Sequence, residues 1–176
     1  MFWLKILKDF IKIFREGQDP KQVAWGFALG MIVGLSPMFN LQGLIVWLLI
    51  LFLNVNLAAA VLGFTIFSII AFIFDPLFHM LGYEILTQLH FFDPAYTYLY
   101  NAPIFPFTKF NNTVVMGSLV SAVVLLLPVY FGMKHFILAY RKHIGSKVEK
   151  WKIFKALKQS SLVRTYIKIR DLGGLR

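Results

Sequence analysis

The sequence predicts an all-α integral membrane protein, and the placement of its charges is the first reason. Hydrophobic residues make up 59% of the 176 residues and charged residues only 15%, against about 25% in a typical soluble domain. No lysine or arginine lies between Gln22 and Thr108. Apart from Lys109, the basic residues lie in the first 21 residues or from Lys134 onward. A soluble protein of net charge +10 would instead spread these charges over its surface.

Long apolar blocks inside this uncharged stretch are the second reason, and they divide a membrane domain over residues 20–134. A helix needs about 20 apolar residues to cross a membrane. Two blocks are long enough, 57–74 and 113–133. Two are short, at 15 and 16 residues: 22–36 and 38–53. At about 1.5 Å per residue they extend only roughly 23 Å. We therefore predict a short helical hairpin broken near Pro37, favouring a re-entrant arrangement over two further crossings.

The segment between the two long blocks is predicted to leave the hydrocarbon core. Residues 76–90 form a further short helix, with Asp75 as its N-cap and Pro76 in its first turn. Residues 91–112 are rich in aromatics, prolines and asparagines, a composition typical of a loop at the level of the lipid headgroups.

Both ends of the chain are predicted to be basic amphipathic helices at the cytoplasmic surface. Residues 1–18 carry basic side chains at helical spacing, at Lys5, Lys8, Lys12 and Arg15. In the tail, residues 135–176, the matching positions are Lys147, Lys150, Lys155 and Lys158. Anionic lipid headgroups are the expected partner of both. For the first helix, packing on another protein is the alternative. For the tail, nucleic acid is the alternative partner. We do not expect it to bind nucleic acid, because the chain already lies in a membrane. Two positive ends predict an even number of crossings, with both termini cytoplasmic.

The short hairpin carries the first candidate site. Gly26, Gly30 and Gly34 share one helix face, and small residues at this spacing let another helix approach closely in lipid. Pure packing explains that face. A broken helix that frees backbone groups beside a polar site is the other reading. The residues of that candidate site, for a polar group or lipid headgroup, are Ser36, Pro37, Asn40, Gln42 and Gly43.

Asp75, His79 and Glu84 form a secondary candidate site. Ionisable residues near the membrane are costly, so a functional role has to be weighed. The readings are helix capping with interfacial placement, contact with a polar substrate, or metal binding and catalysis. Their spacing matches no strong metal motif. No nucleophile with its base and no nucleotide motif occurs, so we predict no catalytic residue, no metal and no cofactor.

The stretch from Asp19 to about Leu86 resembles a family of small bacterial membrane proteins, the domain of unknown function 2062 family. The residues that carry the resemblance are Pro20, Ala24, Gly26, Ala28, Gly30, Gly34, Pro37, Gln42, Gly43 and Asn56. The chain looks closest to a subgroup with a longer aromatic-rich loop and a basic tail. It departs from the pattern at Phe39-Asn40, where many members have glycine. The resemblance implies a protein of the bacterial inner membrane and brings no activity or catalytic residues.

Three functional hypotheses follow. The first is a non-enzymatic inner-membrane component that handles lipid or a lipid-linked carrier as the base of a larger envelope complex. Such a small chain is expected to form a homo-oligomer or to join a larger membrane or periplasmic partner, such as a lipid-transfer protein. The second is a scaffold that docks partner helices through the Gly26, Gly30 and Gly34 face. The third is a membrane enzyme that uses Asp75, His79 and Glu84, and it requires those side chains to converge.

Overall fold

The computed structural model describes residues 19–37 and 40–142, and within these ranges every regular element is helical. The elements in chain order are α2 (Pro20–Leu35), α3 (Leu41–Phe52), α4 (Leu57–Thr87), η1 (His90–Phe92), α5 (Asp93–Asn101), η2 (Phe105–Thr108) and α6 (Thr113–Tyr140). The predicted terminal helices, with their basic residues Lys5, Lys8, Lys12, Arg15, Lys147, Lys150, Lys155 and Lys158, lie outside the described residues.

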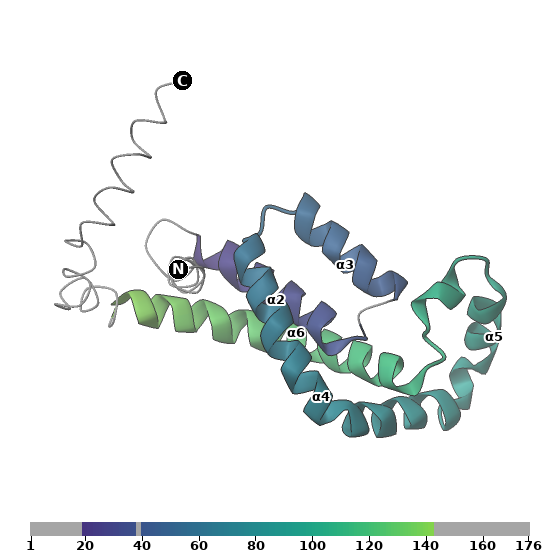
Figure 1. Cartoon of the computed structure of the whole chain (residues 1–176). Coiled ribbons are helices and arrows are strands. Elements are labelled where there is room, and N and C mark those ends of the chain that lie inside the picture. The colour runs from purple at the N-terminus through teal and green to yellow at the C-terminus, as the bar shows by residue number, and fades with distance from the viewer. Residues whose placement is uncertain (1–18, 38–39, 143–176) are drawn as a thin grey trace.

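The helix α2 lies at the centre of the bundle, packed against both α4 and α6 (Figure 1). The shorter α3 lies outside α2 and contacts it through Ile50, which is 2% exposed. Its Trp47 also meets Phe64 of α4 edge-on, with ring centroids 5.7 Å apart. The start of α2 and the end of α6 lie at the same end of the molecule, and the α5 segment lies at the other. The core is therefore formed by the mutual contacts of α2, α4 and α6, and α3 packs on the outside of this core.

The predicted break near Pro37 separates two helices. Asp19 caps α2 by accepting a hydrogen bond from the Lys21 amide at 2.9 Å, and Pro20 fills the first helical position. The helix ends at Leu35, where Ser36 turns extended, as the residue before a proline prefers. Asn40 then caps α3. The two helices have 16 and 12 residues, roughly 24 and 18 Å.

The predicted helix boundary at Asp75 and Pro76 is wrong. The helix α4 runs without interruption from Leu57–Thr87, with Pro76 in its interior. A proline removes one backbone hydrogen bond and bends a helix without necessarily ending it. Figure 1 shows α4 bending partway along its length. The expected blocks 57–74 and 76–90 are thus two halves of one bent helix.

The expected loop over residues 91–112 is more ordered than predicted. It holds the short helices α5 and η2, and Lys109 ends η2 in a left-handed conformation with a φ of 55°. The last long block is also longer than 113–133, because α6 reaches Tyr140. The basic end of the chain therefore begins within a helix, with Lys134 on α6.

Close helix crossings at glycine hold the bundle together. A Cβ atom on Gly30 would come within 3.0 Å of the backbone of Ala60 and Phe64 on α4. Gly63 of α4 lies equally close to the backbone of Phe27 on α2. Farther along, Gly82 of α4 and Gly117 of α6 face each other at a second crossing. At both places only glycine lets the two backbones approach.

Much of the outer surface is apolar. Among the described residues, two helices are long and apolar enough to cross a membrane, Leu57–Thr87 and Thr113–Tyr140. In the most apolar 18-residue stretch of each helix, only 22% and 28% of the stretch is buried inside the protein. The core helix of a soluble protein would be mostly buried, so these exposed faces support a membrane protein.

Candidate functional site

Three polar residues lie at the adjoining ends of α2 and α3, on either side of the hairpin turn. Ser36 is the residue at the end of α2, Asn40 caps α3, and Gln42 lies in the first turn of α3. Ser36 is 5% exposed and Asn40 8%, while Gln42 is partly buried. Of the other residues predicted for this site, Pro37 is exposed and Gly43 is buried in α3. Two buried polar residues and one partly buried one therefore lie where the two apolar helices adjoin.

Each of these three side chains has a buried polar atom without a hydrogen-bond partner among the described residues. The atoms are Ser36 Oγ, Asn40 Nδ2 and Gln42 Nε2. Buried polar side chains are nearly always hydrogen-bonded in folded proteins, and each unmade bond costs about 1–3 kcal/mol. Three such atoms on residues that flank one turn are the strongest indication of a binding site among the described residues.

The start of α3 contributes to the same place. The Asn40 side chain accepts a hydrogen bond from the Gly43 amide at 2.7 Å through its Oδ1 atom. The amides of Leu41 and Gln42 precede Gly43 in the first turn, so they have no acceptor within the helix. Because Oδ1 is held over this turn, the unpartnered Nδ2 of Asn40 also lies beside the helix start. The tip therefore combines free side-chain donors with the positive end of a helix.

The glycine face predicted on α2 lies against α4 of the same chain. Gly26 approaches the backbone of Asn56, and Gly34 approaches Phe64 and Ser68. These residues, with Gly30, hold the hairpin on α4, and the face is not open to a partner helix. A scaffold role for this protein would need another surface.

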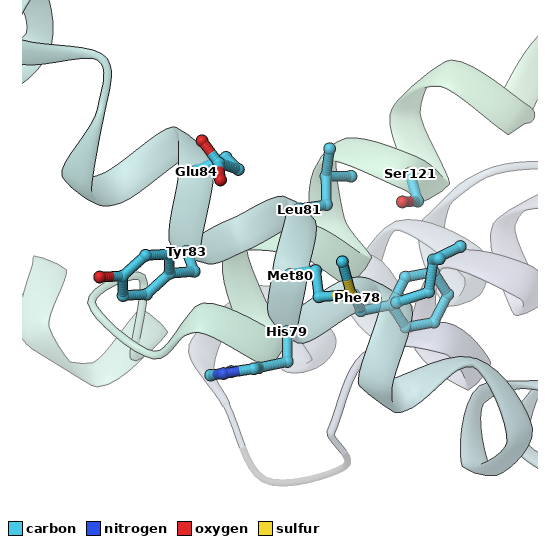
Figure 2. A pocket seen from close by; sticks show the side chains of 8 residues that line it. Phe78, His79, Met80, Leu81, Tyr83, Glu84 and Ser121 are labelled. Atoms are coloured by element: carbon cyan, nitrogen blue, oxygen red, sulfur yellow. The ribbon is translucent and has the colours of Figure 1, made fainter.

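Asp75, His79 and Glu84 do not come together. Asp75 and His79 are one turn apart on α4, but Glu84 is five residues beyond His79, about 140° around the helix. Figure 2 shows His79 and Glu84 pointing to opposite sides of α4. The His79 Nδ1 atom lies 2.6 Å from Thr113 Oγ1, where α6 begins. Among the described residues, no three histidine, cysteine or acidic side chains could share a metal ion.

Two open cavities lie away from the hairpin tip. One, of about 390 Å³, is lined mostly by apolar residues of α4, with Glu84 at its edge and Ser121 on α6 (Figure 2). The other, of about 360 Å³, is lined by Tyr96 and Tyr100 of α5 together with Asn111. Among the described residues, neither cavity is lined by a residue with a buried polar atom that lacks a hydrogen-bond partner, so the tip is the stronger candidate for a binding site.

Tyr96 links the α5 segment to α4. The Tyr96 hydroxyl donates to the Ile85 carbonyl at 3.4 Å, and its ring stacks near Phe110. Burial raises the pKa of the Tyr96 hydroxyl, and the nearby Asp93 carboxylate raises it further. Tyr96 therefore stays protonated, as a hydrogen-bond donor, throughout the physiological range.

Sequence reasoning missed the second glycine crossing. In α6 the signal was present, since Thr113, Gly117 and Ser121 recur every four residues. In α4, Gly82 stands alone among large residues and gives no such pattern.

Over the described ranges 19–37 and 40–142, the architecture and the hairpin define a class: a helical protein with two helices able to span a membrane and a short polar-tipped hairpin packed beside them. The chain belongs to the family described as uncharacterized protein conserved in bacteria (DUF2062), which matches residues 5–144. It is 24% identical over 161 residues to an uncharacterized protein of Treponema pallidum (strain Nichols), a match that covers 92% of this chain and 99% of the relative. No solved structure matches.

Proposed function

We propose that this protein is a non-enzymatic component of the bacterial inner membrane that binds lipid, or a lipid-linked carrier, at the tip of the α2–α3 hairpin. The observation that carries the proposal is the set of buried, unpartnered polar atoms on Ser36, Asn40 and Gln42. In a membrane such atoms find few water molecules, and leaving them unbonded is costly. A polar group delivered by a bound molecule satisfies them.

The surroundings of the tip favour a lipid as that molecule. Directly after the tip, α3 exposes a run of large apolar side chains. Leu44 is 56% exposed and Ile45 is 47% exposed. A molecule with a polar head and apolar chains fits a polar tip bordered by such a surface, whereas a water-soluble ligand fits only the tip.

The proposed orientation places both termini in the cytoplasm. Lys21 lies at the start of α2, and Arg141 and Lys142 follow the end of α6, at the same end of the molecule (Figure 1). The positive-inside rule assigns this end to the cytoplasm. The hairpin, entering from that side, then reaches roughly 24 Å into a core of about 30 Å.

A larger assembly is part of the proposal. At 20.3 kDa the chain is small for a protein that moves lipid across a bilayer by itself. We therefore propose that it works as a homo-oligomer or as the membrane base of a larger envelope protein that carries lipid onward.

Native mass spectrometry of the protein purified in mild detergent tests lipid binding. The double variant Ser36→Ala and Gln42→Met removes two unpartnered donors while keeping the side chains' approximate volumes. We expect it to retain much less lipid than the wild type. The matched control is Ser68→Ala, because that hydroxyl already donates to the Phe64 carbonyl of its own helix at 2.8 Å. Equal lipid retention in all three proteins would contradict the proposal.

A further inference from the structure

We infer that the chemical group held at the hairpin tip is the singly charged phosphodiester of a lipid headgroup. This rests on the proposed function and adds the identity of the bound group. Two features beyond burial support it: the chemistry of the unpartnered atoms and the helix start beside them.

The unpartnered atoms can donate hydrogen bonds, so their partners have to be acceptors. Asn40 Nδ2 and Gln42 Nε2 are amide nitrogens, which only donate hydrogen bonds, and the Ser36 hydroxyl can donate as well. Asn40 cannot be reversed to present its oxygen instead, because Oδ1 already accepts the Gly43 amide at 2.7 Å. A ligand that satisfies all three therefore has to be rich in acceptors, as a phosphate or a carboxylate is.

The start of α3 adds a preference for negative charge. The helix has 12 residues, long enough for its aligned peptide dipoles to place a partial positive charge at the tip. The first-turn amides of Leu41 and Gln42 add two more donors beside the side chains. Oxyanions bind at helix starts of this kind. Here Asn40 caps the helix and Ser36 lies four residues before it; each is more than nine-tenths buried and has one polar atom without a partner among the described residues.

The charge of the ligand is limited by the few cations that the described residues place near the hairpin. No lysine or arginine occurs between Gln22 and Thr108, so α3 and α4 carry none. Lys109, which directly follows η2, is a single cation next to an element that contacts α3. Burying a doubly charged phosphomonoester beside a single cation costs much more than burying a single charge. A phosphodiester carries one negative charge and two free acceptor oxygens, which suits neutral donors and a helix dipole.

The headgroup and the chains of one lipid fit adjacent parts of the hairpin. With the phosphodiester at the start of α3, the acyl chains run along the outer face of this helix. That face carries the exposed residues Leu44, Ile45, Leu48 and Leu51. Phosphatidylglycerol has this combination of groups, while diacylglycerol lacks only the phosphodiester and its headgroup.

The test compares four probes added to delipidated full-length protein and measured by native mass spectrometry: phosphatidylglycerol, phosphatidic acid, diacylglycerol and inorganic phosphate. We expect phosphatidylglycerol to bind most tightly. The test variant is Asn40→Asp, because aspartate caps a helix as well as asparagine does but replaces the Nδ2 donor with negative charge. We expect it to bind phosphatidylglycerol at least about tenfold more weakly.

The matched control is Asn112→Asp, which makes the same change at the N-cap of α6, where Asn112 accepts from the Val115 amide at 3.1 Å. It should bind as the wild type does. Thermal unfolding of each variant checks folding, and the double variant Ser36→Ala and Gln42→Met, expected to weaken binding too, serves if Asn40→Asp does not fold.

Each remaining outcome is decisive. Equal binding of diacylglycerol and phosphatidylglycerol would overturn the phosphodiester and leave lipid binding standing. Tighter binding of phosphatidic acid would overturn the preference for a single charge. Binding of inorganic phosphate without phosphatidylglycerol would overturn a lipid as the source of the group. If the wild type binds no lipid at all, the proposed function itself fails.

Discussion

At the scale of single residues, the side chains that we propose bind the ligand also lower the stability of the ligand-free protein. Ser36, Asn40 and Gln42 each hold a buried donor without a partner among the described residues. Each such atom lowers the stability of the ligand-free protein by about 1–3 kcal/mol. Residues retained for packing alone would not carry this cost.

The first prediction concerns stability without lipid. In delipidated protein, Ser36→Ala and Gln42→Met should raise the melting temperature, by about 2–4 °C for each kcal/mol gained, because unbonded polar atoms are replaced by apolar ones. Thermal unfolding with and without added lipid measures this. A lower melting temperature in the delipidated variant would mean that these side chains have structural partners and would contradict the account.

The sequence indicates which residues lie at the tip, but not how their side chains are buried and hydrogen-bonded. Asn40 and Gln42 stand out because they are polar within an apolar run, and Pro37 marks the break. Which of their atoms lack partners depends on the Asn40 cap on Gly43 and on burial by neighbouring helices. Neither can be read from a linear pattern.

At the scale of elements, the glycine crossings determine how the helices assemble. The second prediction compares Gly30→Ala with Gly132→Ala. The first puts a Cβ atom against the α4 backbone, which cannot easily move, and should cost about 1–3 kcal/mol. Gly132 has open space around its Cβ position, so alanine there should stabilise α6 by up to about 1 kcal/mol. Thermal unfolding in detergent distinguishes them, and similar destabilisation by both would contradict the crossing.

The third prediction tests the continuity of α4. Because Asp75 lies inside the helix rather than at its start, Asp75→Ala should change the unfolding free energy by less than about 0.5 kcal/mol. Asn112 is an N-cap with a hydrogen bond to the Val115 amide. Asn112→Ala should therefore cost about 1 kcal/mol. A larger loss for Asp75→Ala than for Asn112→Ala would restore the helix boundary at Pro76.

Element boundaries could be predicted where the chain breaks sharply. The expected blocks 22–36 and 38–53 match α2 and α3 to within three residues, because Pro37 and Asn40 end one helix and start the next. The boundary predicted at Asp75-Pro76 is wrong because an aspartate followed by proline, which starts many helices, can also lie inside a bent helix. The glycine pattern on α2 predicted close packing, but not that α4 of the same chain is the partner.

At the scale of the whole molecule, charge placement and helix length agree. Lys21, Arg141 and Lys142 lie at one end of the described bundle, and the aromatic segment around α5, which includes Lys109, lies at the other (Figure 1). Membrane proteins place aromatic side chains at the interfaces and excess positive charge on the cytoplasmic side. The class could be predicted from the sequence because these signals are compositional, whereas the packing of α2 between α4 and α6 arises only in three dimensions.

The fourth prediction concerns orientation in the membrane. The chain contains no cysteine, so single cysteines can be introduced directly. In intact cells, a membrane-impermeant maleimide should label Tyr98→Cys, since Tyr98 is 76% exposed on α5. Lys21→Cys and Lys142→Cys should be labelled only after lysis. Labelling of Lys21→Cys in intact cells would contradict the proposed topology.

The most direct measurement of the central claim is nuclear magnetic resonance of side-chain amides in ¹⁵N-labelled protein during titration with phosphatidylglycerol. Asn40 is assigned by the loss of its signal in Asn40→Asp. The account predicts that phosphatidylglycerol shifts the amides of Asn40 and Gln42, that diacylglycerol does not, and that Asn101, already bonded to the Thr97 carbonyl at 2.7 Å, stays in place. Unmoved signals of Asn40 and Gln42 at saturating phosphatidylglycerol, or equal shifts with diacylglycerol, would contradict it.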